Sequence, residues 1–156
     1  MIYQIETFPK KGFSETHGKH ILQDVKDSGI KGVRKISYSA LFQLEGHMNL
    51  REIDRIAREL LTDPITQTYS LLNPMNPRHS TAEKGYEIEI WFRPGVTDTV
   101  ADSVVKAVRD LGIEKHTKVK TGHKYLIETS LSKGAVEQMV KRLLANPMIQ
   151  EYKKVK

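Results

Sequence analysis

Two segments of the chain, residues 2–8 and 86–92, alternate between apolar and polar positions. Every second residue from Tyr86 to Phe92 is apolar, and the residues between them are mostly polar. A period of two is typical of a strand that buries one face, because successive side chains point to opposite sides of a sheet. The pattern therefore predicts two strands that occupy equivalent places in the two halves of the chain.

Apolar residues at helical spacing follow each of these strands. Glu15 and Asp98 are residue types that can accept hydrogen bonds from the free amides of a first helical turn, and glycines 29 and 112 can end a helix with a left-handed residue. The pattern predicts one helix before each glycine. Its apolar positions are Ile21, Leu22 and Val25 in the first half and Val104, Val105 and Val108 in the second.

Each of these helices should be followed by a β-hairpin. In the first half the hairpin would span residues 33–44, with alternating apolar residues towards its end. In the second half it would span residues 118–128 and turn near Thr121 and Gly122, because glycine is favoured in tight hairpin turns.

A second helix in each half is predicted by apolar residues that recur every three or four positions. Asn49, with Glu52 three residues later, has the spacing of a capping box, and Ser132 is the equivalent start in the second half. The buried faces should be formed by Ile53, Ile56, Ala57, Leu60 and Leu61, and by Val136, Met139, Val140, Leu143 and Leu144.

Both second helices end in the same motif, found at residues 60–69 and 143–152. Each copy has two leucines, an Asp-Pro or Asn-Pro stop and a Gln-x-Tyr ending, and the copies are 83 residues apart (152 − 69). The same offset aligns the chain back to Tyr3 and Tyr86 without a gap, which indicates an internal duplication.

The duplication predicts an α+β fold of tandem β-α-β-β-α(-β) ferredoxin-like units. Residues 1–70 would form the first repeat, 71–85 a linker rich in Pro and Asn, and 86–156 the second repeat. A chain of about 70 residues buries only a small core, so we expect the two repeats to pack together as a pseudo-dimer.

The amino-acid composition excludes several classes of protein. The chain contains no Cys, which excludes disulfides and cysteine nucleophiles and fits a reducing cytoplasm. It carries 25 Lys and Arg against 19 Asp and Glu, a net charge of +6, but acids and bases are interleaved as on an ordinary solvated surface. No apolar run approaches the roughly 18 residues of a membrane span. We therefore expect a cytoplasmic protein that binds neither membrane nor nucleic acid.

Candidate chemistry is sparse. No glycine-rich phosphate loop is present, and His17 and His20 could share a helix face but have no third metal ligand at a suitable spacing. Carboxylates repeated in both halves, such as Glu6 and Glu89, fit solvated strand positions better than acid–base roles. We expect no catalytic, cofactor-binding or metal-binding residue in this chain.

Four segments carry a resemblance to a known family. They are residues 15–19 (Glu-Thr-His-Gly-Lys), 29–34 (Gly-Ile-Lys-Gly-Val-Arg), 42–45 (Phe-Gln-Leu-Glu) and 143–152, whose Leu-Leu-Ala-Asn-Pro-x-Ile-x-x-Tyr pattern is the most specific. Each half resembles the small PurS subunit of phosphoribosylformylglycinamidine synthase, and the tandem resembles the N-terminal part of the large single-chain synthases.

The resemblance implies a non-catalytic component of purine biosynthesis. It would bridge an ATP-dependent synthetase subunit and a glutaminase subunit, so that ATP and Mg²⁺ belong to the assembled complex and not to this chain. The family motifs suggest partner contacts at Glu15, Thr16, Gly18, Lys19, Asp98, Thr99, Asn146, Pro147 and Tyr152. The chain departs from the family pattern in two places: residues 100–102 lack the Gly-Lys of the first helix entry, and Thr62-Asp63 replaces Ala-Asn. If these motifs contact partners, the halves have specialised and each keeps part of the contact surface.

Several alternatives stay open. Paired ferredoxin-like units of the amino-acid-binding ACT type would make the chain a small-molecule sensor, with saturable stabilisation by its ligand. RNA binding would show as affinity that falls steeply with salt. The chain could also be the leading region of a longer synthase, and the tandem could dimerise again.

Overall fold

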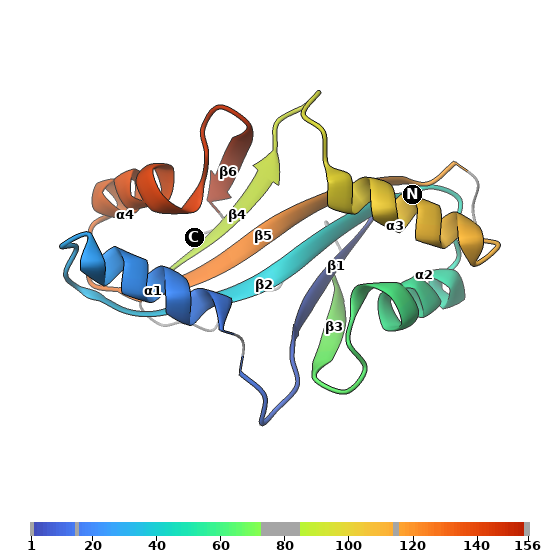
Figure 1. Ribbon diagram of the computed structural model, residues 1–156, viewed down its shortest axis with the longest axis horizontal. Coiled ribbons are helices and arrows are strands. Elements are labelled where there is room, and N and C mark those ends of the chain that lie inside the picture. Colours follow the sequence, from blue (N-terminus) through green and yellow to red (C-terminus); the bar gives the residue numbers. More distant parts are fainter. Residues whose placement is uncertain (1, 15, 73–84, 114–115, 155–156) are drawn as a thin grey trace. The chain divides into compact units, whose positions relative to one another are not determined.

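A computed structural model describes residues 2–14, 16–72, 85–113 and 116–154 (Figure 1). Each half of the chain has the order β-α-β-α-β, so the duplicated α+β fold is confirmed. The first half contains β1 (Ile2–Pro9), α1 (His17–Asp27), β2 (Val33–Glu45), α2 (Leu50–Ile56) with its continuation η1 (Ala57–Leu61), and β3 (Gln67–Leu72). The second contains β4 (Gly85–Phe92), α3 (Thr99–Asp110), β5 (Lys118–Thr129), α4 (Lys133–Met139) with its continuation η2 (Val140–Leu144), and β6 (Gln150–Lys154). Most of the predicted linker, residues 73–84, lies outside the described residues.

The two predicted hairpins are wrong. Residues 33–45 form one strand, β2, and residues 118–129 form one strand, β5, which runs through Thr121 and Gly122 without turning. A two-residue hairpin turn needs positive φ at its centre, and the glycines with positive φ near these strands lie before them, at Gly29, Gly32 and Gly112. Glycine alone was therefore a poor signal for a turn inside an alternating segment.

The described chain forms two compact units, and each unit draws on both sequence repeats. Unit 1 comprises the described parts of Met1–Ser14, Ala40–Arg78 and Thr97–Gly122; unit 2 comprises those of Glu15–Ser39, His79–Val96 and His123–Lys156. Two of the boundaries, after Ser39 and after Gly122, fall inside β2 and β5, so each of these long strands contributes one segment to each unit. The predicted repeats and the compact units are different divisions of the same chain.

The core of unit 1 is completed by a helix of the second repeat. Its strands are neighbours in the order β3, β1, β2, β5, and Ile5 of β1 is opposite Phe42 of β2 and Leu71 of β3. Helix α3 adds Val104 and Val108 to this core. The buried cluster is Ile5, Phe42, Leu44, Met48, Ile53, Ile56, Ala57, Leu61, Val104 and Val108.

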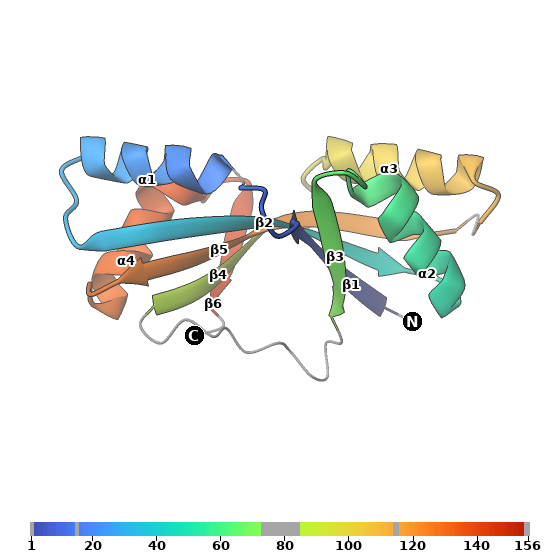
Figure 2. The same ribbon diagram turned by 90° about the horizontal axis from the view of Figure 1, so that it is seen from below.

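The core of unit 2 is completed in the same way by a helix of the first repeat. Its strands are neighbours in the order β2, β5, β4, β6, with Ile90 of β4 opposite Tyr152 of β6. Helices α1 and α4 lie on one face of these strands (Figure 2), and α1 contributes Val25. The buried cluster is Val25, Val33, Ile36, Ile88, Ile90, Tyr125, Ile127, Val136, Met139 and Val140.

Helix ends follow the predicted residues. Asn49 accepts a hydrogen bond from the Glu52 amide while the Glu52 carboxylate accepts from the Asn49 amide, so the capping box is confirmed. The second helices widen into a π-helical last turn, in which the Thr62 hydroxyl donates to the Ala57 carbonyl at 2.9 Å and the Ala145 amide donates to that of Val140 at 2.9 Å. Among the described helices none has the length and apolar character to cross a membrane.

Candidate interaction sites

The Asp/Asn-Pro motif builds the same turn in both halves. In the first, the Asp63 carboxylate accepts from the Ile65 amide at 2.9 Å, and the Gln67 side chain accepts from the Asp63 amide at 2.9 Å. In the second, the Asn146 side chain accepts from the Met148 amide at 3.1 Å, and the side chain of residue 150 accepts from the Asn146 amide at 2.9 Å. The repeated Asp/Asn and Gln therefore have local structural roles, as side chains that close a turn often do.

Each turn is fastened to the end of a neighbouring strand. The Lys10 side chain donates to the Pro64 carbonyl at 2.5 Å, and the Arg93 side chain donates to the Pro147 carbonyl at 2.8 Å. The main-chain amides of both basic residues also donate to the turn, to Thr66 and Ile149 respectively, at 2.8 Å. Each turn, which precedes the last strand of its repeat, is thus bonded to the residue that follows the first strand of the same repeat.

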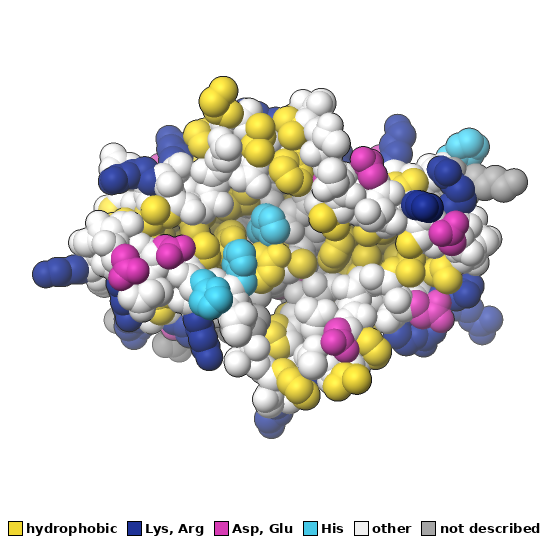
Figure 3. Space-filling model, in the orientation of Figure 1, with side chains coloured by type: hydrophobic (Ala, Val, Ile, Leu, Met, Phe, Trp, Pro, Cys, Tyr) yellow, Lys and Arg dark blue, Asp and Glu magenta, His cyan; other side chains and the backbone are white. Residues whose placement is uncertain are grey.

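An apolar side chain is presented at the tip of each turn. Ile65 is 73% exposed and Met148 is 84% exposed. By contrast, the side chains of the Asp/Asn and Gln residues of each motif are hydrogen-bonded within the turn. Figure 3 shows hydrophobic side chains over these turns. Exposed apolar side chains on a rigid turn are typical of contact points for another protein, whereas single ones also occur at random. The equivalent placement of two such residues favours the first interpretation.

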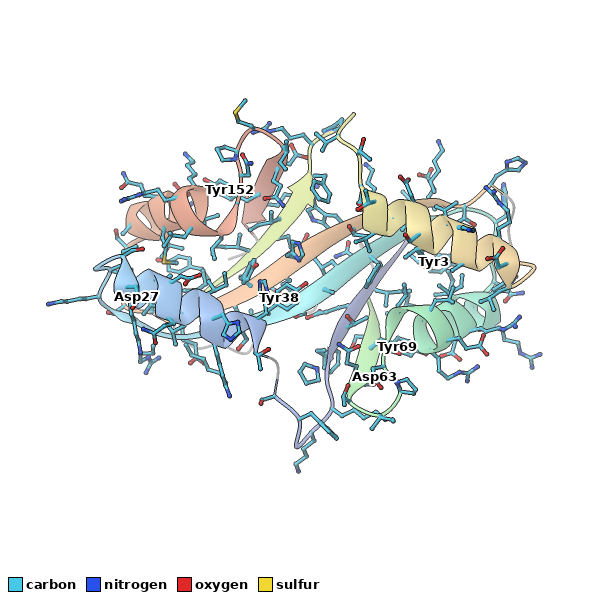
Figure 4. The ribbon with its side chains drawn as sticks, viewed as in Figure 1. Tyr3, Asp27, Tyr38, Asp63, Tyr69 and Tyr152 are labelled. Atoms are coloured by element: carbon cyan, nitrogen blue, oxygen red, sulfur yellow. The ribbon has the colours of Figure 1, made fainter. Side chains whose placement is uncertain are left out.

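The tyrosine that ends each motif points the other way. Tyr69 and Tyr152 are partly buried and pack against the cores of units 1 and 2, beside the second helix of each repeat (Figure 4). The first tyrosine of each repeat has a matched role: the Tyr3 hydroxyl donates to the Met48 carbonyl at 3.1 Å, and the Tyr86 hydroxyl to that of Leu131 at 3.2 Å. Tyr152, predicted as a partner contact, therefore has a packing role in the structure.

The start of α3 is closed by Asp98. Its carboxylate accepts from the Ala101 amide at 3.0 Å, which caps the helix, and also from the main-chain amide of Thr121 at 2.9 Å and the Thr121 hydroxyl. A carboxylate at a helix N-terminus is also favoured by the helix dipole. Of the two residues predicted here as partner contacts, Asp98 is thus committed within unit 1, while Thr99 begins the helix.

The start of α1 differs from that of α3 because its cap residue makes no side-chain hydrogen bond to the helix. Glu15 lies outside the described residues, and Thr16 occupies the cap position without a side-chain hydrogen bond to the helix. Gly18 is buried, whereas Lys19 is exposed. Of the predicted contact residues at this end, Thr16 and Lys19 therefore reach solvent.

A cluster of two histidines and two tyrosines lies beside the start of α1; we call His17, Tyr38, His123 and Tyr125 the Tyr–His cluster. His17 Nε2 is 2.9 Å from the Tyr125 hydroxyl, and the Tyr38 hydroxyl is 2.8 Å from His123 Nδ1. The four rings pack together, with the His17 and Tyr38 centroids 4.2 Å apart. Tyr38 points from β2 towards the helix-covered face (Figure 4).

Sequence reasoning missed this cluster. His17 was considered as a metal ligand together with His20 and as part of the family segment 15–19, Tyr125 was placed in a hairpin, and Tyr38 was given no role. The sequence contained one signal of the cluster, a difference between the two halves. The four residues of the cluster are His or Tyr, whereas three of the four residues at the 83-residue offset are apolar. These matched residues are Val100, Thr121, Ala40 and Phe42. Within the described part of the chain, no three His, Cys, Asp or Glu side chains gather as metal ligands.

Unit 2 also contains a buried ion pair that sequence reasoning did not find. Lys124 Nζ of β5 lies 2.5 Å from Glu87 Oε1 of β4, and the two side chains are only 9% and 5% exposed. The matched positions in unit 1 are Leu41, which is fully buried, and Gln4. Burying two charges is costly unless each satisfies the other, so the two residues depend on one another.

Comparison with known protein families identifies both halves of the chain. The family model described as PurS, phosphoribosylformylglycinamidine (FGAM) synthase, matches residues 3–73 and again residues 85–155. Each matched segment contains one of the two β-α-β-α-β halves. The chain belongs to the PurS family, as a tandem duplication of it. No curated protein matches the sequence.

Family membership gives the chain its biological setting. It indicates a role in purine biosynthesis and association with the other subunits of FGAM synthase. The resemblance inferred from the sequence motifs is thus confirmed, including its extent over both halves.

Proposed function

We propose that this chain is the non-catalytic bridging component of a glutamine-dependent FGAM synthase. It would hold a glutaminase subunit and an ATP-dependent synthetase subunit in the geometry that transfers ammonia between them. The observation that carries the proposal is the match of both halves to the PurS family. A duplicated chain is suited to this task because it carries the family unit twice and could use one copy for each partner.

The chemistry of the assembly would reside in the partners. A glutaminase of this class uses a cysteine nucleophile activated by histidine, and this chain has no Cys. ATP and Mg²⁺ would be bound by the synthetase subunit, where formylglycinamide ribonucleotide is converted to the amidine. The chain would contribute position alone, which matters because ammonia released into solvent is lost to the reaction. We place the assembly in the cytoplasm.

The two fastened turns are our candidates for the partner contacts. The turn at residues 63–66 presents Ile65, and the turn at 146–149, which contains the family residues Asn146 and Pro147, presents Met148. Both turns are closed by their own hydrogen bonds and bonded to a neighbouring strand end, so we expect little conformational entropy to be lost when a partner binds. Apolar anchors of this kind, inserted into a partner's pocket, often provide most of the binding energy.

The helix entries differ enough to recognise different partners. At α1 the exposed Lys19 follows His17 of the Tyr–His cluster by two residues. At α3, Asp98 is engaged with Thr121, and the position matching Lys19 is Asp102. Opposite charges at matched positions favour partners of opposite charge. We propose that the start of α1 and the 146–149 turn, both in unit 2, help to select one subunit. The start of α3 and the 63–66 turn, both in unit 1, would help to select the other.

The test is co-elution of the chain with both partner subunits on size-exclusion chromatography with light scattering. We expect Ile65→Ser to weaken one contact and Met148→Ser to weaken the other, with binding of the second partner retained in each case. Leu50→Ser is the matched control, because Leu50 is 63% exposed but is the first residue of α2 and belongs to neither turn. Undiminished binding of both partners by the double Ile65→Ser, Met148→Ser variant would rule out the turns as contacts.

A further inference from the structure

The turns at residues 63–66 and 146–149 differ in the chemistry of the side chain that each presents. The first presents Ile65 and the second presents Met148, at matched positions of the 83-residue offset. Both side chains are apolar and strongly exposed, at 73% and 84%. Isoleucine has no atom that a mild oxidant attacks, whereas the thioether of methionine is oxidised to a polar sulfoxide. The two matched turns therefore differ in their response to an oxidant.

The other methionines of the described residues, Met48 and Met139, are shielded. Met48 is 2% exposed, and its sulfur accepts from the Thr117 hydroxyl at 3.9 Å. Met139 is 1% exposed and belongs to the core of unit 2. Met1 and Met75 lie outside the described residues. Within the described part of the chain, an oxidant in solution therefore reaches the sulfur of Met148 most readily.

We propose that Met148 is a redox-sensitive modification site, at which a peroxide converts the thioether to a sulfoxide. In this step a sulfur lone pair attacks one peroxide oxygen, the O–O bond breaks and an S–O bond forms. The sulfur is oxidised by two electrons and the peroxide is reduced. The departing hydroxide takes the proton of the transferred oxygen and leaves as water. Sulfoxide reductases can reverse this modification, so the site can act as a switch.

The hydrogen bonds that close this turn do not involve the Met148 side chain. The Asn146 side chain accepts from the main-chain amide of Met148 at 3.1 Å, and the Gln150 side chain accepts from the Asn146 amide at 2.9 Å. The Arg93 side chain donates to the Pro147 carbonyl at 2.8 Å. Oxidation therefore adds a polar group at the tip of the turn and leaves these bonds in place.

The sulfoxide changes what the turn offers to a partner, an effect that rests on the function proposed above. An apolar anchor gains free energy when it enters an apolar pocket. A polar group that enters such a pocket without a hydrogen-bond partner loses its hydration instead. The 63–66 turn keeps its isoleucine under the same conditions. A peroxide should therefore weaken one of the two partner contacts and leave the other unchanged.

The first measurement uses the whole chain alone and does not depend on the proposed function. Dilute hydrogen peroxide is added, and peptide mass spectrometry follows sulfoxide formation at each methionine with time. Met148 should be oxidised much faster than Met48 and Met139, with an unchanged circular dichroism spectrum. Equal rates of oxidation at Met148 and Met48 would overturn the inference.

The second measurement tests the effect on binding. The chain is oxidised, the peroxide is removed, and each untreated partner subunit is titrated separately. Binding of one partner should weaken about tenfold or more, binding of the other should not change, and sulfoxide reductases should restore the loss. The control Met148→Ile installs the residue that the first turn has, so its binding should not respond to peroxide.

The outcomes separate this inference from the bridging function. An untreated chain that binds neither subunit would contradict the bridging function, and the effect on binding with it. If the untreated chain binds both subunits and the sulfoxide form binds both equally well, the switch alone is overturned. An equal loss of binding in oxidised Met148→Ile would also overturn it, because the responsible residue would then lie elsewhere.

Discussion

The Tyr–His cluster of unit 2 and its matched positions in unit 1 have different side chains on the same arrangement of strands and helices. In unit 2, His17 and Tyr125 form one hydrogen-bonded pair and Tyr38 and His123 form another. In unit 1 the same positions hold Val100 with Phe42, and Thr121 with Ala40. Thr121 is bonded instead to Asp98, the cap of α3. The same backbone framework therefore supports two different surfaces beside a helix entry.

The turns behave in the opposite way. Asp63 and Asn146 close equivalent turns with nearly equal hydrogen bonds, and Gln67 and Gln150 brace them identically. Positions that define the path of the chain have been retained, whereas positions beside the helix entries have diverged. This division indicates that the two units share a scaffold and differ in the side chains beside their helix entries.

The largest expected effect comes from separating the repeats. Because α3 completes the core of unit 1 and α1 completes that of unit 2, residues 2–72 alone leave both cores incomplete. We expect this fragment not to fold as a monomer. Circular dichroism and light scattering at low micromolar concentration measure this, and adding residues 73–156 as a second chain should restore a cooperative unfolding transition. A fragment that unfolds cooperatively as a monomer would contradict the shared cores.

The buried ion pair should give the next largest effect. Lys124→Leu leaves Glu87 buried without its partner and should lower the free energy of unfolding by about 3–5 kcal/mol. The double variant Lys124→Leu, Glu87→Gln installs the unit 1 residues of the matched positions and should recover most of this loss. Urea unfolding measures both. If the double variant is as unstable as the single one, the two side chains are not coupled.

Removal of the α3 cap should have a smaller effect. Asp98→Ala loses the hydrogen bond to the Ala101 amide and both contacts with Thr121, and we expect a loss of about 1–2 kcal/mol. Ser132→Ala, which removes a cap bonded only to the helix amide of Ala135, is the control and should cost about 1 kcal/mol. Equal losses in the two variants would show that the Thr121 contacts add no stability.

The smallest effect tests the Tyr–His cluster itself. Tyr125→Phe gives unit 2 the residue of unit 1 and removes one hydrogen bond, so we expect a loss of about 1 kcal/mol in urea unfolding and a shifted His17 ring resonance in NMR spectra. The reciprocal Phe42→Tyr should cost more than 1 kcal/mol, because the residue matching His17 is Val100 and offers no hydrogen-bonding group. An unchanged His17 resonance in Tyr125→Phe would contradict the pairing.

Much of the local structure could be predicted from the sequence. The capping box at Asn49 and the Gly29 and Gly112 helix ends each depend on residues close together in the chain, and the duplication depends on a constant offset of 83 residues. Each is found in the structure. The hairpin predictions failed because alternation continues through Gly122 and one long strand has the same period as two short ones. The sequence did not predict that the first helix of each repeat packs in the core with the other repeat, nor did it predict the Tyr–His cluster, because both depend on contacts between residues about 100 positions apart.

The central claim, that this chain couples two subunits without catalysing either reaction, is tested most directly by a reconstitution. Synthetase and glutaminase subunits are assayed for amidine formation with and without this chain, using either glutamine or ammonium as the nitrogen source. We predict that omitting the chain abolishes glutamine-dependent formation and leaves ammonium-dependent formation intact. Undiminished glutamine-dependent formation without the chain, or hydrolysis of glutamine by the chain alone, would contradict the account.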